Sequence, residues 1–179
     1  MIEPRYLIPK TKSVERTVFT EDYVKGKDIL HIGIGGAIHD KKLKKEFLST
    51  DISNWFHSRI SNKANSIVTI ELEQDNIDKF KENIPGVYIK GDITSSNIVD
   101  TISKKFDLII FTEIIEHLDC NRAALQNIKS LLHPKGQVLI STIDAFNIFM
   151  FFKLFFRYES NHIEHTSYFS YLTDRKSVV

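Results

Sequence analysis

Apolar residues in the chain fall into two kinds of segment, short continuous runs and longer runs with helical spacing. Continuous apolar runs are typical of strands buried on both faces, and they predict strands at 28–32, 66–70, 87–90, 107–112 and 137–141. Helical spacing between these runs predicts helices at 54–64, 75–83, about 95–104 and 121–132. The alternation of strand and helix indicates an α/β fold that is Rossmann-like, with a mostly parallel sheet and helices on both faces.

Local signals at the ends of these elements add further expectations. Asp51 and Ser53 are suitable N-caps for the helix at 54–64, and a serine at position 95 or 96 is expected to open the helix after the third strand. The segment 134–136, Pro-Lys-Gly, predicts a turn between the last helix and the fifth strand.

The two ends of the chain are less regular. Residues 13–23 are expected to form one short helix or strand. After residue 141 no further strand is recognisable, so the C-terminal strands of a complete sheet are expected to be missing. The segment 148–156 contains five of the thirteen phenylalanines. It is expected to pack in the core, to cover an apolar ligand as a lid, or to contact a membrane or a second subunit.

Composition excludes several classes of protein. The 24 Lys and Arg residues nearly balance the 23 Asp and Glu residues, and a net charge of +1 argues against a dedicated nucleic-acid binder. Cys120 is the single cysteine, which excludes an intramolecular disulfide and favours a reducing, cytoplasmic location. No apolar run approaches the roughly 20 residues of a membrane span, and Met1 to Arg5 show no apolar signal core.

Residues with ligand-binding chemistry follow the predicted strands. Gly33 and Gly35 follow the first strand, Glu71 the second, Asp92 the third and Thr112 ends the fourth. In a parallel sheet ligands bind beyond the carboxyl ends of the strands. Glycines allow the backbone to approach a ligand closely. The Glu71 carboxylate can accept from both hydroxyls of a ribose, and the Asp92 carboxylate can accept from an adenine amine. The pattern predicts a nucleoside site.

The glycine turn indicates which nucleoside cofactor binds. A dinucleotide fingerprint, G-x-G-x-x-G, requires a glycine at position 38, where this chain has Ile38. Asp40 would also repel a pyrophosphate near the start of a helix. A cationic sulfonium that bears an amino acid therefore fits the turn better than a dinucleotide does.

Three segments resemble a known family. Residues 28–36, 106–119 and 131–142 are similar to ordered motifs of the class I S-adenosylmethionine (SAM)-dependent methyltransferases. The nearest group acts on small molecules and has Glu-x-x-Glu-His after the fourth strand, as in 113–117 here. The resemblance covers 23–142 and implies a single methyltransferase-like domain over 1–179, with 143–179 as an acceptor-side or lid segment.

The resemblance implies a role for each matching residue. The residues near the methionine part and the ribose of SAM would be His31, Gly33, Gly35 and Glu71. The residues near its adenine would be Leu72, Asp92 and Ile93. The residues at the methyl end and on the substrate side would be Thr112, Glu113, Glu116 and His117. The chain departs from the family at His31, where an acid is usual, and at Ala37, where a third glycine is usual.

Spacing suggests a catalytic group after the fourth strand. Glu113, Glu116 and His117 are expected to share one helical face by their i, i+3, i+4 spacing, or else to form a solvated capping turn. His117 is a candidate general base, with Glu116 beside it.

The remaining polar and aromatic residues are not expected to bind a metal or the cofactor. His162 and His165 are spaced as two metal ligands, but no third ligand lies near them in the sequence, so no metal is expected. The segment from His165 to Phe169 resembles the one that closes over the acceptor in related enzymes. The lysine-rich segment 41–45 is interpreted as a solvated helix face, and Trp55 and His57 as a core residue and a helix-surface residue.

These observations predict methyl transfer from SAM to a small-molecule acceptor, with an oxygen of a glycan or lipid-linked precursor as the expected target. One alternative is a non-catalytic SAM-fold partner subunit, which His31 and Ala37 would suit. An NAD-dependent oxidoreductase is a further alternative, disfavoured by Ile38. Self-association or peripheral membrane contact is expected through 148–156, and no nucleic-acid partner is expected.

Overall fold

The computed structural model describes residues 14–35, 51–144, 152–153, 155–157 and 165–169. Expectations for Ala37, Ile38, Asp40, the segment 41–45 and His162 lie outside these residues. The chain forms two compact units. The sheet unit comprises 14–112 and 120–140, and the small unit comprises 113–119 with the described residues from 141 onward.

Five strands form the sheet in the order β3-β2-β1-β4-β5. Their bounds are Asp28–Ile32 for β1, Ser66–Glu71 for β2, Val87–Lys90 for β3, Phe106–Thr112 for β4 and Leu132–Ser141 for β5. β1 is parallel to β2 and β4, and β2 is parallel to β3. β5 is parallel to β4. Gly136 of β5 lies against the Phe106 carbonyl at the start of β4, and the Ser141 carbonyl at the end of β5 accepts from the N–H of Glu113, which directly follows β4.

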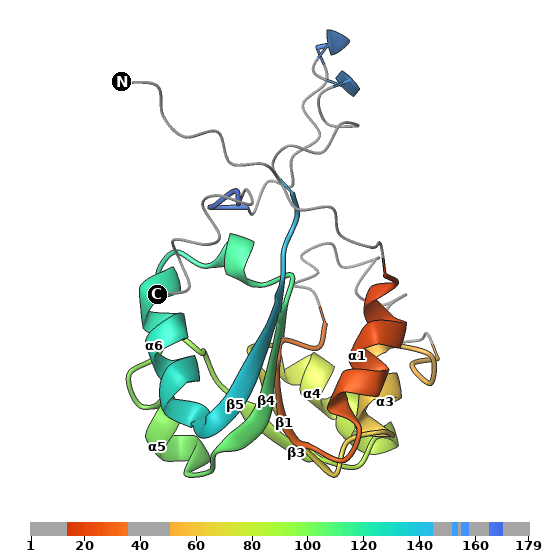
Figure 1. The fold of residues 1–179 in the computed structure, drawn as a ribbon, viewed down its shortest axis with the longest axis vertical. Coiled ribbons are helices and arrows are strands. Elements are labelled where there is room, and N and C mark those ends of the chain that lie inside the picture. The colour runs from red at the N-terminus through yellow and green to blue at the C-terminus, as the bar shows by residue number, and fades with distance from the viewer. Residues whose placement is uncertain (1–13, 36–50, 145–151, 154, 158–164, 170–179) are drawn as a thin grey trace. The chain divides into compact units, whose positions relative to one another are not determined.

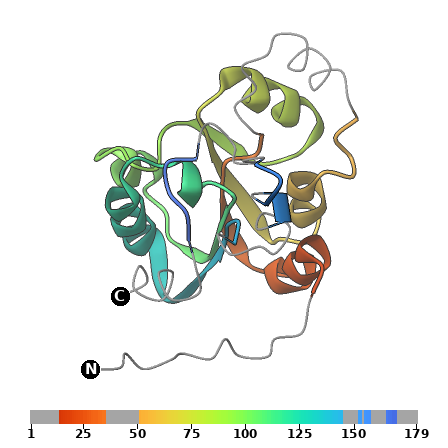
Figure 2. The ribbon, with the colours of Figure 1, turned by 90° about the horizontal axis from the view of Figure 1, so that it is seen from above.

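Helices cover both faces of this sheet, as the sequence predicted. Figures 1 and 2 show α1, α3 and α4 on one face and α5 and α6 on the other. Their bounds are Arg16–Val24 for α1, Phe56–Ser61 for α3, Gln74–Asn83 for α4, Ile98–Ile102 for α5 and Asn121–Leu131 for α6. The Rossmann-like α/β fold class is thereby confirmed, and the short N-terminal element is a helix.

The core includes β1, which is the central strand, and its neighbour β4. Ile29 and Leu30 of β1 are fully buried, as are four successive residues of β4, Leu108, Ile109, Ile110 and Phe111. Successive side chains of a strand point to opposite faces, so covering both faces requires apolar residues without alternation. This is why the strands appeared as continuous apolar runs in the sequence.

Three local predictions were wrong at element ends. α3 begins at Phe56 without a side-chain cap, because the Asp51 carboxylate accepts instead from the N–H and hydroxyl of Ser53. α5 begins only at Ile98, while the Ser95 hydroxyl donates to Asn97. Short polar side chains satisfy nearby groups in turns as readily as they cap helices. Finally, β5 begins at Leu132, directly after α6, and includes the segment 134–136 that was expected to be a turn.

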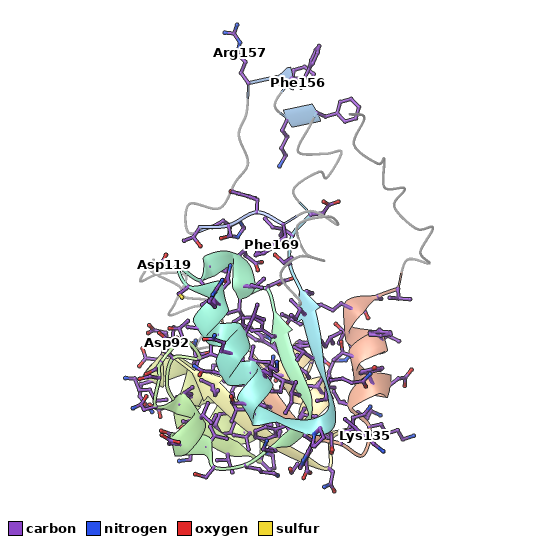
Figure 3. All side chains as sticks on the ribbon, turned by 60° about the vertical axis from the view of Figure 1, so that its left-hand side comes forward. Asp92, Asp119, Lys135, Phe156, Arg157 and Phe169 are labelled. Atoms are coloured by element: carbon purple, nitrogen blue, oxygen red, sulfur yellow. The ribbon has the colours of Figure 1, made fainter. Side chains whose placement is uncertain are left out.

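The small unit contains the turn η1, Ile115–His117, and several segments from the C-terminal part of the chain. A parallel bridge pairs Asp144 with Phe169. Among the residues that the structure describes after β5, this bridge is the longest piece of strand pairing. Among the described residues of 148–156, the side chains of Phe152, Phe155 and Phe156 are exposed, and Figure 3 labels Phe156 and the neighbouring Arg157. These three phenylalanines therefore do not pack in the core.

No helix in the described part of the chain combines the length and the apolar character needed to cross a membrane.

Candidate functional site

The turn after β1 has the backbone geometry that glycine permits. Gly33 has a φ of 70°, in the left-handed region, and its N–H donates to the Ile70 carbonyl at 2.8 Å. A side chain at this position would strain the backbone. The hydrogen bond holds the turn against the carboxyl end of β2, so the glycine turn and Glu71 lie together as predicted.

Glu71 is buried rather than exposed on the surface. Its Oε2 accepts from the N–H groups of Ile34 and Gly35 at 2.8 and 3.2 Å. Its Oε1 accepts from the N–H groups of Leu72 and Glu73 at 2.9 and 3.1 Å. A carboxylate offers about four acceptor sites, and these four donors fill them. A ribose hydroxyl would therefore have to replace one of the backbone donors, and Gly35 holds the longest of the four bonds.

The predicted adenine residues lie at the adjoining strand ends. The Gly91 N–H donates to the Glu71 carbonyl at 3.0 Å, so the ends of β2 and β3 are joined. Leu72 is 60% exposed, which leaves an apolar side chain available to a flat ring. Asp92 is exposed and accepts from the Thr94 N–H at 2.7 Å, and Figure 3 shows it pointing outward.

Ile93, the third predicted adenine residue, is held in place by α6. Its side chain is buried, and its carbonyl accepts from the Asn127 side chain of α6 at 2.7 Å. The same amide donates to the Ser95 carbonyl at 2.9 Å. The backbone after β3 is therefore held in place by α6.

His31 lies in the core beside a second buried histidine. Its Nδ1 is 2.8 Å from Nδ1 of His57, and Nε2 of His57 is 3.1 Å from the Tyr88 hydroxyl. Burial lowers the pKa of His57 to about 3, and it lowers the pKa of His31 well below its usual value. Both rings are therefore neutral at ordinary pH. The expectation that His57 lies on the helix surface was wrong, because His57 packs edge-on against Phe80 and Tyr88.

The segment after β4 is a broken turn rather than a helix. Thr112 is partly buried at the end of β4, and Glu113 is exposed with a φ of 55°. The helical turn η1 starts only at Ile115, so Glu113 does not share a continuous helical face with Glu116 and His117. That prediction was wrong because the left-handed residue interrupts the helical path. Glu116 is also 1% exposed, which excludes the alternative of a fully solvated turn.

Glu116 and His117 have a neighbour from the C-terminal part of the chain. The ring of His165 lies 4.7 Å from the ring of His117, measured between centroids. The Thr166 and Ser167 N–H groups donate to the Glu116 carbonyl at 2.8 and 3.2 Å. The resemblance of the segment that begins at His165 to an acceptor-side segment was the only sequence signal for this juxtaposition.

A separate hollow of about 380 Å³ lies along α4, between Asp51 and Glu82. It is lined by none of the predicted cofactor residues. The candidate site is therefore the open edge at the strand ends and not this hollow.

Comparison with known sequences assigns the family. The family described as "Methyltransferase domain" matches residues 13–173, which is most of the chain. The chain belongs to the methyltransferase-domain family. This membership confirms the resemblance to the SAM-dependent methyltransferases, and it agrees with the expected enzyme class and with SAM as the cofactor. The narrower resemblance to the group with Glu-x-x-Glu-His stays a prediction. A search of curated proteins found no match.

Solved structures similar to this methyltransferase domain share its fold. DesVI from Streptomyces venezuelae superposes with a TM-score of 0.52 at 14% identity, over 72% of this chain and 50% of that one. The N-methyltransferase NodS from Bradyrhizobium japonicum WM9 gives 0.52 at 15% identity, over 72% of this chain and 65% of NodS. NodS in complex with S-adenosyl-L-homocysteine gives 0.50 at 18% identity, over 70% of this chain and 57% of NodS. This chain therefore spans only half to two thirds of the length of these structures.

Proposed function

We propose that this methyltransferase transfers a methyl group from SAM to a small-molecule acceptor, with an oxygen of a glycan or of a lipid-linked precursor as the nucleophile. Family membership supports the type of reaction. One observation supports SAM as the cofactor. At the carboxyl ends of β1 and β2, the glycine turn is hydrogen-bonded to buried Glu71 and lies beside exposed Leu72.

The residues of this edge fit the parts of the cofactor. Gly33 and Gly35 lie where backbone and ligand could meet without a side chain between them. Glu71 would accept from a ribose hydroxyl in exchange for its 3.2 Å bond to Gly35. Leu72 would cover one face of the adenine, and Asp92 would accept from the adenine amine. His31 is the least suited of the proposed residues, because its ring is buried against His57.

SAM supplies, when bound, a methyl group on a cationic sulfonium that is a good leaving group. The protein then has to align an acceptor and manage one proton. An oxygen acceptor forms its bond to the methyl carbon while the carbon–sulfur bond breaks, and its hydroxyl proton must leave. His117 is the candidate to take that proton, since an imidazole can accept one near neutral pH, and buried Glu116 is adjacent to it in the chain.

Calorimetry with SAM, S-adenosylhomocysteine and NAD tests the cofactor. We expect the first two to bind and NAD not to bind. Transfer of a labelled methyl group from SAM to components of a cell extract then tests the reaction. Binding of NAD alone would support the oxidoreductase alternative. Binding of SAM with no labelled product from any extract fraction would favour the non-catalytic partner subunit.

A further inference from the structure

We infer that Glu116, His117 and His165 form a binding site for a divalent transition-metal cation. One donor atom of each side chain, a carboxylate oxygen and two imidazole nitrogens, lies within 4.8 Å of the others. Ligand atoms around a cation bonded at roughly 2.1 Å are about 3.0–3.4 Å apart. Small side-chain rotations would therefore bring all three donors onto one ion.

The backbone holds the two parts of this cluster together. The Thr166 N–H and hydroxyl both donate to the Glu116 carbonyl, at 2.8 and 3.1 Å. The same hydroxyl is 2.8 Å from the Leu118 carbonyl. His165 immediately precedes Thr166, so these bonds keep its ring beside η1. These hydrogen bonds therefore hold His165 close to Glu116 and His117, although it lies far from them in the sequence.

The carboxylate has the environment expected of a ligand. Glu116 is 1% exposed, and burying an ionised carboxylate is costly unless a cation or hydrogen bonds compensate it. The Thr142 hydroxyl donates to Oε2 of Glu116 at 3.0 Å. Outer-shell bonds of this kind orient ligating carboxylates in metal sites.

The donor set indicates the class of ion. Two imidazoles and one carboxylate are typical of sites for Zn²⁺, Fe²⁺, Mn²⁺ and Co²⁺, and such three-ligand sites keep coordination positions open. Ca²⁺ and Mg²⁺ prefer oxygen donors throughout. The expectation of no metal depended on the absence of a third ligand near His165 in the sequence. The fold supplies Glu116 and His117 from the segment after β4 instead.

The consequence for catalysis rests on the proposed function. An open position on the cation would bind a hydroxyl of the acceptor, and a bound cation lowers the pKa of a coordinated hydroxyl. The oxygen would lose its proton to water and form its bond to the methyl carbon as the carbon–sulfur bond breaks. His117 would then act as a ligand and not as the proton acceptor. Hydroxyl compounds would be preferred over amines as acceptors.

Metal binding can be measured without SAM and without an acceptor, so this test is independent of the proposed function. Tag-free protein is stripped with a chelator and titrated with Co²⁺ and with Mn²⁺ in a calorimeter, and Co²⁺ binding is also followed by its visible absorption. We expect one ion per chain. The variants His117→Ala and His165→Ala should each weaken binding by about tenfold or more.

His133→Ala is the matched control, because His133 is an exposed histidine on β5 and belongs to the sheet unit. Its affinity for both ions should equal that of the wild type. Glu116→Gln retains an acceptor for Thr142 and serves as a second variant if circular dichroism shows that an alanine variant is unfolded. Absence of one-to-one binding in the wild type, or equal binding by the wild type and the folded histidine variants, would overturn the proposal.

Discussion

Nδ1 of His31 and Nδ1 of His57 lie 2.8 Å apart in the core, between β1 and α3. One of the two nitrogens must carry a hydrogen and the other must accept it. Because burial keeps both rings neutral, the two histidines are in complementary tautomers. The rings are also stacked, with their centroids 5.1 Å apart. Protonation of either ring would place a charge in a site that burial keeps apolar.

This pair predicts that acid destabilises the protein. The pKa of His57 is about 3 in the folded state against 6.5 ordinarily, and the pKa of His31 is also lowered by burial. The unfolded chain therefore takes up protons first as the pH falls. The stabilisation is complete above about pH 6.5 and decreases toward pH 3. Urea unfolding at about pH 7.5 and about pH 5 should show a loss of roughly 2 kcal/mol from His57, with a further loss from His31.

The variant His57→Phe isolates this effect, because it removes one titrating ring from an aromatic environment. Its unfolding free energy should fall less between about pH 7.5 and about pH 5 than that of the wild type, because only the His31 ring remains to titrate at these two positions. His133→Ala, at an exposed position, should leave the pH dependence unchanged. An equally steep pH dependence in His57→Phe and in the wild type would show that the pair is not responsible.

Substitution of Glu71 should weaken cofactor binding. Hydrogen bonds to a charged acceptor contribute about 1.5–3 kcal/mol, so Glu71→Ala should raise the Kd for SAM roughly tenfold to a hundredfold. Because Glu71 also accepts from the Ile34 and Gly35 N–H groups, the variant should unfold at lower urea as well. Calorimetry of the folded variant gives the Kd. Glu82→Ala, at an exposed position on α4, is the control; an unchanged Kd for Glu71→Ala would falsify the ribose role.

His117→Ala should separate cofactor binding from turnover. His117 is in the small unit, and none of the proposed contacts to ribose or adenine involves it. The Kd for SAM should remain close to that of the wild type, while turnover with the true acceptor should fall on the order of 10²–10⁴. Asp119→Asn, an exposed neighbour, should retain full turnover. Wild-type activity that resists chelation but rises with pH would assign His117 as a proton acceptor and not as a metal ligand.

Gly136→Ala should be more destabilising than Gly26→Ala. A Cβ at Gly136 would lie 2.7 Å from the Phe106 carbonyl oxygen, which belongs to the backbone of β4 and cannot rotate away. A Cβ at Gly26 would meet no atom within 4 Å, and the cost there comes from a φ of 71° alone. We expect about 1 kcal/mol for Gly26→Ala and about 2–3 kcal/mol for Gly136→Ala. Urea unfolding of both variants provides the comparison, and equal losses would contradict it.

The exposed phenylalanines of the small unit should promote association. Phe155 and Phe156 are 81% and 71% exposed, and their rings contact each other edge-on. We expect the chain to self-associate through this segment, as sedimentation velocity would show, and the double variant Phe155→Ser, Phe156→Ser to shift the distribution toward monomer. Sedimentation with anionic vesicles tests peripheral membrane contact in the same way. A wild type that stays monomeric and does not bind vesicles would contradict both forms of the prediction.

The sequence by itself determined the sheet and the position of the edge at which we propose that the cofactor binds. Continuous apolar runs identify strands buried on both faces, and alternating helices make those strands parallel. Once the strands are parallel, the residues that follow them are placed on one edge without any knowledge of packing. Gly33, Glu71 and Asp92 were found in this way. The same logic predicted the strand bounds of β1 and β3 correctly.

The tertiary structure decided how those side chains are used. Nothing in the spacing of Glu71 indicates that its carboxylate binds four backbone amides. The contact of His31 with His57 depends on the packing of α3 against β1, and it turned an expected surface histidine into a core residue. Likewise, His165 meets Glu116 and His117 only through hydrogen bonds between segments far apart in the chain. Local patterns reflect the periodicity of a single element, whereas these contacts are set by which elements pack together.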